Sequence, residues 1–348
     1  AAGVRPVIVT GDHPFTVRVV AREVGWEVGP DRIMTGLTLD TLSDEELQQR
    51  IRSIDIFARV EPRHKVRIVQ AFRAQGEVVA MLGDGVNDAP ALKAADIGVA
   101  VNSGTDIAKE TADLLLLENH FGVITAAIRE GRVIFDNIRR IFLFLVSDSF
   151  AEVLVIAFAL ILQLPMPLTA VQILWMNLVS DTFPNLALTL EKASDGVMRR
   201  KPRKKGAPIV NRVVGTLVVV TTLAASIGAF ALYYYILKTT GDLVRARTVV
   251  FVMTALDSMF YVISIRHLHK PLWRMPFFSN PTLFAAILLS VSLQVIVVYV
   301  PFLQPIFSTS SLGWFDWLLI IATGLLQIAA IEAVKARFMG RGEIEEEV

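Results

Sequence analysis

The chain has 348 residues, 53% of them hydrophobic, and 34 basic residues against 33 acidic ones give a net charge of +1. This balance gives no electrostatic basis for nucleic-acid binding. The absence of cysteine excludes disulfides, thiolate metal sites and a cysteine nucleophile. Residues 1–140 alternate charged and apolar segments, whereas residues 141–334 hold nearly all of the long apolar runs. The composition therefore predicts a soluble region followed by a membrane region.

The first region alternates short apolar runs with amphipathic segments. Such alternation predicts an α/β domain with a parallel, Rossmann-like sheet. A helix is expected to begin near Pro62, because proline is favourable in the first turn of a helix. The expected strands are residues 4–9, 55–58, 77–82 and 96–100, and the other expected helices are about 14–25 and 90–94.

Polar residues gather where these strands end. Ligands of parallel sheets bind beyond the carboxyl ends of the strands. Glycines on both sides of Asp84 allow a tight turn, and Asp84 and Asp88 could together hold one Mg²⁺. The Thr10 hydroxyl could bind phosphate oxygens, and Lys65 could neutralise phosphoryl charge. These residue types predict a phosphoryl-transfer site that lacks a nucleophile. A structural turn would account for Gly83-Asp84-Gly85 alone, but not for the whole run through Lys93.

Six apolar runs are each close to the length of about 20 residues that a membrane-spanning helix needs. We expect residues 1–123 to form the soluble domain, 124–140 a stalk helix that continues into the first span, 141–338 an all-α six-helix membrane bundle, and 339–348 a tail. The expected spans are about 141–162, 168–190, 213–237, 247–265, 282–300 and 315–334.

Loop charge predicts the orientation of these spans. Eight basic residues lie in 191–212 and three each in 266–280 and 335–348, against three in 238–247 on the other side. Basic loops favour the cytoplasm. We therefore expect an integral protein of a bacterial plasma membrane with both ends of this chain in the cytoplasm.

Several expected spans carry polar residues near their middle. A charge at the bilayer centre costs about 2.5–3.5 kcal/mol on insertion scales, so such residues usually face the bundle interior and serve ions. Glu152 lies on a helix face with Ser149, and Asp181 lies on a face with Asn177 and Ser180. Their oxygens suit Ca²⁺, Na⁺ or Mg²⁺. Hydrogen bonding between helices without transport is the alternative.

Three further residues of these spans bear on the same interpretation. Asp257 is a candidate ligand with fewer polar neighbours. Asp148 could face either a neighbouring helix or a cytoplasmic access route. Pro184 lies one turn after Asp181, and we expect it either to free a carbonyl that lines a cavity or simply to kink the helix.

The motifs of both regions resemble one family. MLGDGVNDAPALKAADIGVAV (Met81–Val101) closely resembles the hinge motif of P-type ATPases, which belong to the haloacid-dehalogenase-like superfamily. TGD at Thr10–Asp12 and FARVEPRHK at Phe57–Lys65 are similar to two more of their motifs, the latter carrying a phosphate-site lysine. VQILWMNLVSD at Val171–Asp181 resembles the sixth membrane helix of the calcium-pump-like subfamily.

The resemblance implies roles for individual residues. Thr10, Gly11 and Lys65 would bind the transferred phosphoryl group, and Asp84 would hold Mg²⁺ beside Asn87 and Asp88. Asp12 and Arg59 would lie near the ATP nucleotide. The implied ligands of the transported cation are Ser149, Glu152, Asn177, Ser180, Asp181 and Asp257. Ser149, Ser180 and Asp257 replace asparagine, threonine and glutamate of calcium pumps, so Mn²⁺, Na⁺ and Mg²⁺ stay open beside Ca²⁺ as the cargo.

The family's DKTGT motif, which carries the phosphorylated aspartate, does not occur in these 348 residues. The chain begins without methionine or a signal peptide, so we expect the C-terminal part of a longer pump that is inactive alone. Its partners would be the missing N-terminal part, membrane lipid and the cation, with no nucleic acid. One alternative is a non-catalytic membrane subunit or regulator derived from a pump. A phosphatase-like domain fused to an unrelated channel is less consistent, because both halves resemble one family.

Overall fold

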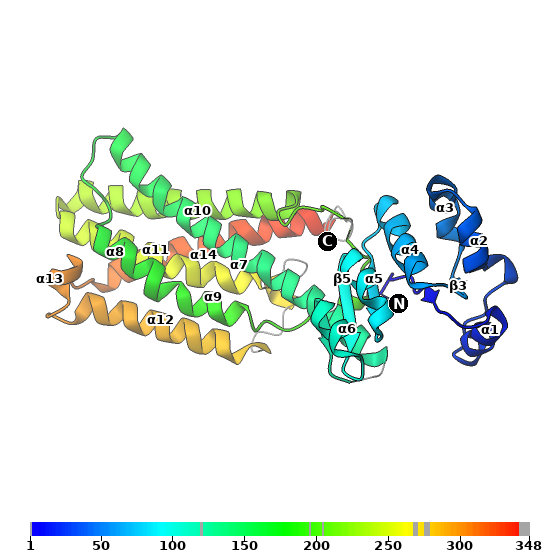
Figure 1. Cartoon of the computed structure of the whole chain (residues 1–348). Coiled ribbons are helices and arrows are strands. Elements are labelled where there is room, and N and C mark those ends of the chain that lie inside the picture. The colour runs from blue at the N-terminus through cyan, green and yellow to red at the C-terminus, as the bar shows by residue number, and fades with distance from the viewer. Residues whose placement is uncertain are drawn as a thin grey trace. The chain divides into compact units, whose positions relative to one another are not determined.

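A computed structural model describes residues 2–118, 121–194, 196–203, 205–266, 271–274 and 279–340 (Figure 1). The chain forms two compact units. The first comprises Ala1–Arg129 with Met198–Ala207, and the second comprises Glu130–Val197 with Pro208–Val348. The division of the soluble region, stalk and membrane region at residues 123 and 140 stays a prediction, and residues 341–348 of the expected tail lie outside the described part.

The first unit contains two parallel sheets, so the expected α/β class is confirmed. One sheet has the order β1 (Ile8–Val9), β3 (Ile56–Ala58), β2 (Ile33–Thr35), and the other has the order β4 (Ala80–Gly83), β5 (Ile97–Val101), β6 (Leu114–Leu116). Ile8 pairs with Ile56 in the first sheet, and Gly83 pairs with Ala100 in the second. The helices around them are α1 (Pro14–Glu23), α2 (Gly36–Thr41), α3 (Asp44–Arg50), α4 (Pro62–Ala74), α5 (Ala89–Ala94) and α6 (Asp106–Thr111).

The expected strand over residues 4–9 is mostly wrong, because only Ile8 and Val9 pair with a neighbour. β1 is an edge strand, and the chain before it is held by a side chain instead. Arg5 donates to the carbonyl oxygens of Arg52 and Ile54 and to the Asp55 carboxylate at 2.5–2.9 Å. The expected strand at 77–82 is likewise shorter, since the Val79 N–H donates to the Asp96 side chain before β4 begins.

The second unit is all-helical. Its elements are α7 (Phe121–Ile161, whose first residues belong to the first unit), α8 (Ala170–Trp175), α9 (Thr182–Leu188), α10 (Arg212–Thr240), α11 (Leu243–Ile265), α12 (Pro281–Tyr299), α13 (Gln304–Phe307) and α14 (Trp314–Gly340). Five of the described helices, α7, α10, α11, α12 and α14, are long and apolar enough to cross a membrane. α11 is the central helix, because 89% of its most apolar stretch is buried inside the protein, against 28–44% for the other four.

The segment expected to be a single span at 168–190 is instead a broken helix. A π-helical turn, η4 (Met176–Ser180), separates α8 from α9, and the Asp181 N–H donates to the Met176 carbonyl at 3.0 Å. Pro184 has no N–H to offer the carbonyl four residues before it, which is that of Ser180. The Ser290 hydroxyl of α12 donates to this carbonyl at 3.0 Å instead. Pro184 therefore frees a backbone oxygen, and a neighbouring helix supplies its donor.

Candidate functional site

The Gly83–Asp88 turn lies at the carboxyl end of β4. The Lys65 Nζ atom of α4 lies 2.5 Å from Oδ1 of Asp88, and the Gly85 N–H donates to Oδ2 of the same carboxylate at 3.3 Å. Asp88 is buried, with 6% of its surface exposed. The Asp84 backbone carbonyl accepts from the Thr105 N–H at 2.8 Å, which fixes the turn while the residue stays exposed. Asp88 thus positions Lys65, and Asp84 remains accessible to a ligand.

A second turn follows β1. The Thr10 hydroxyl oxygen accepts from the Asp12 N–H at 3.1 Å, and the Thr10 carbonyl accepts from the Val60 N–H at 3.1 Å. The Arg59 N–H donates to the Asp12 carbonyl at 3.0 Å. Arg59 has a φ of +52°, a left-handed conformation that is uncommon for a residue other than glycine. These bonds bring the Thr10–Asp12 turn and Arg59 together just before α4, the helix that carries Lys65.

The structure thus joins the predicted phosphate-site residues into two groups. One contains Lys65 and Asp88, beside Asp84 and the exposed Asn87, and the other contains the Thr10–Asp12 turn and Arg59. Within the described residues, no hydrogen bond links the two groups directly. Asp88 has both carboxylate oxygens engaged, whereas the Asp84 carboxylate, in an exposed turn, has no hydrogen bond to another described residue. This donor set fits a Mg²⁺ that is held chiefly by Asp84 and completed by water or phosphate oxygens.

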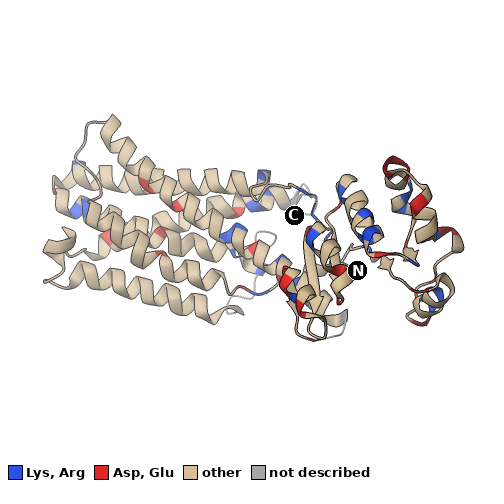
Figure 2. Cartoon of the chain, viewed as in Figure 1, with Lys and Arg blue, Asp and Glu red and all other residues tan. Residues whose placement is uncertain are grey.

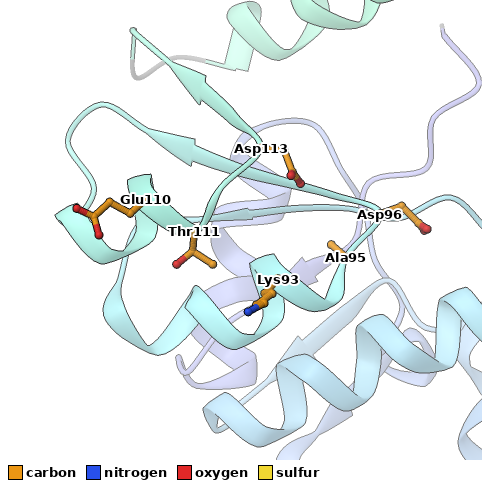
Figure 3. A pocket seen from close by; sticks show the side chains of 6 residues that line it. All are labelled: Lys93, Ala95, Asp96, Glu110, Thr111 and Asp113. Atoms are coloured by element: carbon orange, nitrogen blue, oxygen red, sulfur yellow. The ribbon is translucent and has the colours of Figure 1, made fainter.

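A cavity of about 470 Å³ lies on the same unit, lined by Lys93, Ala95, Asp96, Glu110, Thr111 and Asp113 (Figure 3). Asp96 and Asp113 precede β5 and β6, so the cavity lies at the amino ends of these strands. Asp84 and Asp88 lie beyond the carboxyl end of β4, at the opposite end of the strands. The Asp96 carboxylate forms ion pairs with Arg73 at 3.3 Å and Lys205 at 2.9 Å. This cavity is therefore separate from the predicted phosphate site.

Two glycines of this turn provide a matched pair of substitutions. A Cβ added at Gly83 would lie 2.5 Å from the Cβ of Asp88, whereas one at Gly85 would lie 3.6 Å from the nearest atom. We expect Gly83→Ala to destabilise the chain by about 1–3 kcal/mol, the usual cost of overpacking, and to displace Asp88 from Lys65. Gly85→Ala is the control and should be near neutral. Thermal unfolding of both variants measures the difference, and equal unfolding temperatures would contradict this geometry.

The polar residues of the membrane unit form a first group around Glu152. The Asn177 amide donates to both carboxylate oxygens of Glu152, at 3.1 and 3.3 Å, which links α7 to η4. The Glu152 residue is buried, with 6% of its surface exposed. Ser149 and Asn177 lie on exposed faces of their helices. Glu152 therefore connects the first two expected spans, and Ser149 lies one turn before it on α7.

A second group surrounds Asp181. The Ser258 hydroxyl of α11 donates to Asp181 Oδ1 at 2.9 Å, and the Asp148 carboxyl group lies within hydrogen-bonding reach of Asp181. The hydroxyl oxygens of Ser147 and Ser180 are buried without a hydrogen-bond partner in the described residues. The sequence left Asp148 open and missed Ser258. Asp148 carried one usable signal, because it shares a helix face with Glu152 four residues later.

Asp257 contacts a different helix. The Gln327 amide of α14 donates to Asp257 Oδ2 at 2.9 Å. Figure 2 shows acidic residues partway along the long helices of this unit. Within the described residues, no basic side chain pairs with Glu152, Asp181 or Asp257, and no three or more His, Cys, Asp and Glu residues are arranged to hold a metal ion. A cation here would depend on amide, hydroxyl and carbonyl oxygens as well as on the carboxylates.

Comparison with known proteins matches both units. Residues 165–337 match the family model for the C-terminus of cation transporting ATPases, and residues 1–96 and 66–128 match models for haloacid dehalogenase-like hydrolases. The chain is 41% identical over 324 residues to a calcium-transporting ATPase of Bacillus subtilis, covering 92% of this chain and 36% of that protein.

Two other relatives are also named calcium-transporting ATPases. Calcium-transporting ATPase 1 of Bacillus cereus is 36% identical over 96% of this chain and 39% of its own length, and calcium-transporting ATPase 1 of Saccharomyces cerevisiae is 38% identical over 92% and 34%. The chain thus spans little more than a third of the length of these relatives.

Proposed function

Because the chain belongs to the P-type cation-transporting ATPases, we propose that it is the C-terminal part of an ATP-driven pump that moves Ca²⁺ across a membrane. It would supply the second half of the phosphorylation domain and the last membrane helices. The relatives named as calcium-transporting ATPases favour Ca²⁺ over Mn²⁺, Na⁺ or Mg²⁺.

The observation that carries this proposal is the group of buried carboxylates between α7 and the broken helix. Glu152, Asp148 and Asp181 are buried, each with 6% or less of its surface exposed, and no basic side chain in the described residues compensates them. Buried charges without partners are costly, so they pair, bind cations or take up protons. Several carboxylates with neutral oxygens around them are typical ligands of Ca²⁺, which takes 6–8 oxygens.

The soluble unit would bind the phosphoryl group that ATP donates. The Thr10 hydroxyl, the Gly11 backbone and Lys65 would contact the phosphoryl oxygens, and Asp88 would hold the Lys65 ammonium in position. Mg²⁺ at Asp84 would supply positive charge to these oxygens. Asn87 would lie beside this site, and Asp12 and Arg59 would lie near the nucleotide. Such a site works mainly by positioning and electrostatic stabilisation.

The open edges of the two sheets indicate where a nucleophile would enter. Among the strands that the structure describes, β1 pairs only with β3, and β4 pairs only with β5. A strand added along these edges would end near Thr10 and Asp84, which follow β1 and β4. No DKTGT motif occurs in these 348 residues, so the phosphorylated aspartate would come from another part of the pump. We propose that it lies on such an added strand.

α7 would transmit the state of the phosphorylation site to the cation site. It is continuous from Phe121 to Ile161, so one helix joins the end of the soluble unit to Glu152. Asn137 of α7 donates to the backbone carbonyls of Thr189 and Glu191 at 2.9 and 3.1 Å, which fixes α7 to the segment after α9. Phosphorylation would bias two states of this assembly that differ in cation affinity.

A measurement of ATP hydrolysis distinguishes a pump from a non-catalytic membrane subunit or regulator. We expect the isolated 348-residue chain to hydrolyse no ATP, and the natural gene product that contains it to hydrolyse ATP when Ca²⁺ is added. Robust turnover by the isolated chain would contradict the proposed location of the nucleophile. The absence of a DKTGT motif also fits a non-catalytic subunit or regulator, and a natural gene product that never turns over ATP would favour that function.

A further inference from the structure

His64 lies in the first turn of α4, one residue before Lys65, and only 3% of its surface is exposed. Its Nδ1 atom accepts the Glu61 N–H at 3.0 Å, and its Nε2 atom lies 2.9 Å from Oδ1 of Asp40 in α2. A ring nitrogen that accepts a backbone N–H carries no proton, so the proton of the neutral ring is on Nε2 and is donated to Asp40. The two contacts therefore fix one tautomer of His64, in which Nδ1 is a hydrogen-bond acceptor.

The bond from Glu61 to His64 lies between the two groups of phosphate-site residues. The backbone N–H groups of the two residues before Glu61 donate to the Thr10–Asp12 turn at 3.0 and 3.1 Å. The Glu61 carbonyl accepts from the N–H groups of His64 and Lys65 at 2.9 and 3.3 Å, which begins α4. Glu61 is thus the joint between the turn and the helix that carries Lys65, and His64 holds the N–H of this joint.

The packing of α2 against α4 holds the His64 ring in place. A Cβ added at Gly36, the first residue of α2, would lie 3.1 Å from the His64 ring and would clash with the Arg59 carbonyl oxygen. Only glycine therefore allows this close approach. The hydrogen bond from His64 and the nearby charge of Arg63 lower the pKa of Asp40, so that Asp40 remains a carboxylate and an acceptor.

We propose that His64 is a positioning residue for phosphoryl transfer, which sets the place of Lys65 relative to the Thr10–Asp12 turn by holding the Glu61 N–H. It acts through Glu61 and Lys65 and not by contact with the phosphoryl group. Misplacing a reacting or binding group by about 1 Å can cost as much as about 100-fold in rate. This role rests on the proposed function, because it requires that Lys65 and the turn contact the same phosphoryl group.

Two substitutions separate the roles of the two ring nitrogens. The side-chain oxygen of asparagine is as many bonds from Cβ as Nδ1 is, whereas the terminal atoms of glutamine correspond to Nε2. His64→Asn therefore keeps an acceptor for the Glu61 N–H and loses the contact with Asp40, and His64→Gln does the reverse.

The rate of phosphoenzyme formation tests the proposal. The natural gene product would be mixed with saturating radiolabelled ATP, Mg²⁺ and Ca²⁺ and quenched in acid after short times. We expect His64→Gln to slow phosphorylation by about tenfold or more, and His64→Asn to stay close to the wild-type rate. The Ca²⁺ concentration for half-maximal phosphorylation should not change in either variant, because neither alters the carboxylates of the membrane unit.

Glu46→Ala is the matched control. Glu46 holds the same position in α3 that His64 holds in α4, and its Oε2 atom accepts the Ser43 N–H at 2.8 Å. This variant loses an equivalent cap on a helix that carries no phosphate-site residue, so it should be phosphorylated at the wild-type rate. Asp40→Ala is the second variant, in case His64→Gln does not fold. It removes the acceptor of the Nε2 proton, so Nδ1 can take up the proton instead, and phosphorylation should again slow.

Three results would overturn the proposal. They are a wild-type rate in folded His64→Gln, a loss in His64→Asn as large as that in His64→Gln, and, where His64→Gln does not fold, a wild-type rate in Asp40→Ala. Failure of the proposed pump function would look different. In that case the wild type itself would form no phosphoenzyme with any cation, and the role of His64 would be overturned with it.

Discussion

Asp181→Asn is expected to weaken the Ca²⁺ dependence of phosphorylation in the natural gene product by about 100-fold or more. Removing one member of a buried charge interaction costs about 3–5 kcal/mol, and every 1.4 kcal/mol is about tenfold in affinity. Asparagine has nearly the same shape and can still accept the hydrogen bond from Ser258, so the substitution removes the charge and little else. The Ca²⁺ concentration that gives half-maximal phosphoenzyme measures the effect.

The control for this substitution is Ser292→Ala on α12. Within the described part of the chain, the Ser292 hydroxyl donates only to the carbonyl of Leu288 on its own helix, at 2.7 Å, and the residue is exposed. This variant should respond to Ca²⁺ like the wild type. An Asp181→Asn protein with an unchanged Ca²⁺ response would show that the carboxylates of α7 and the broken helix serve structure alone.

Arg266→Met is expected to destabilise the membrane unit by about 3–5 kcal/mol, because it leaves the Glu191 carboxylate buried without its cation. The Arg266 guanidinium donates to both Glu191 oxygens at 3.0 Å, and Asn280 donates to one of them at 3.0 Å. These contacts join the ends of α9, α11 and α12. Chemical unfolding in detergent, followed by tryptophan fluorescence, measures the loss.

The double variant Arg266→Met, Glu191→Leu is the control, because replacing a whole buried ion pair is often near neutral. It should recover most of the stability that Arg266→Met loses. A single variant as stable as the wild type would show that the pair contributes nothing to the fold.

The same pair predicts a pH dependence. Burial raises the pKa of Glu191, but hydrogen bonds from Arg266 and Asn280 and the charge of Arg266 outweigh it, so the pKa lies below its usual value. A lowered pKa gives stability that is present above the unfolded-state pKa of about 4.3 and is lost as pH falls through the folded-state pKa. The wild type should therefore lose more stability than the double variant on acidification below this range, and parallel pH profiles would contradict the assignment.

The features predicted from sequence are those that local patterns determine. Long apolar runs predicted α10, α11, α12 and α14, although α11 begins four residues before the expected span and α14 ends six residues after it, and Pro62 marked the start of α4. β2 and β6 were not predicted, because three-residue strands show too little alternation to distinguish them from loops. The broken helix around Asp181 was only partly predicted. Pro184 indicated a freed carbonyl, but its donor, Ser290, lies more than 100 residues away in the chain.

The candidate sites show the same limit. Residue types and spacing predicted the chemistry of Lys65, Asp84 and Asp88, but not that Asp88 uses both oxygens on Lys65 and Gly85. The partners of Asp181 and Asp257 depend on how each helix is rotated within the bundle. That rotation is set by packing over the whole unit, so neither Ser258 nor Gln327 could be identified from the sequence.

Ion-dependent phosphorylation of the natural gene product tests the central claim most directly. The purified protein would be incubated with radiolabelled ATP and Mg²⁺, and Ca²⁺, Mn²⁺ and Na⁺ would be added separately, with Mg²⁺ alone as the fourth condition. We predict an acid-stable, hydroxylamine-sensitive phosphoenzyme that forms with Ca²⁺ in the wild type and is lost in Asp181→Asn at the same Ca²⁺ concentration. Equal phosphorylation under all four conditions, or none under any, would contradict the account.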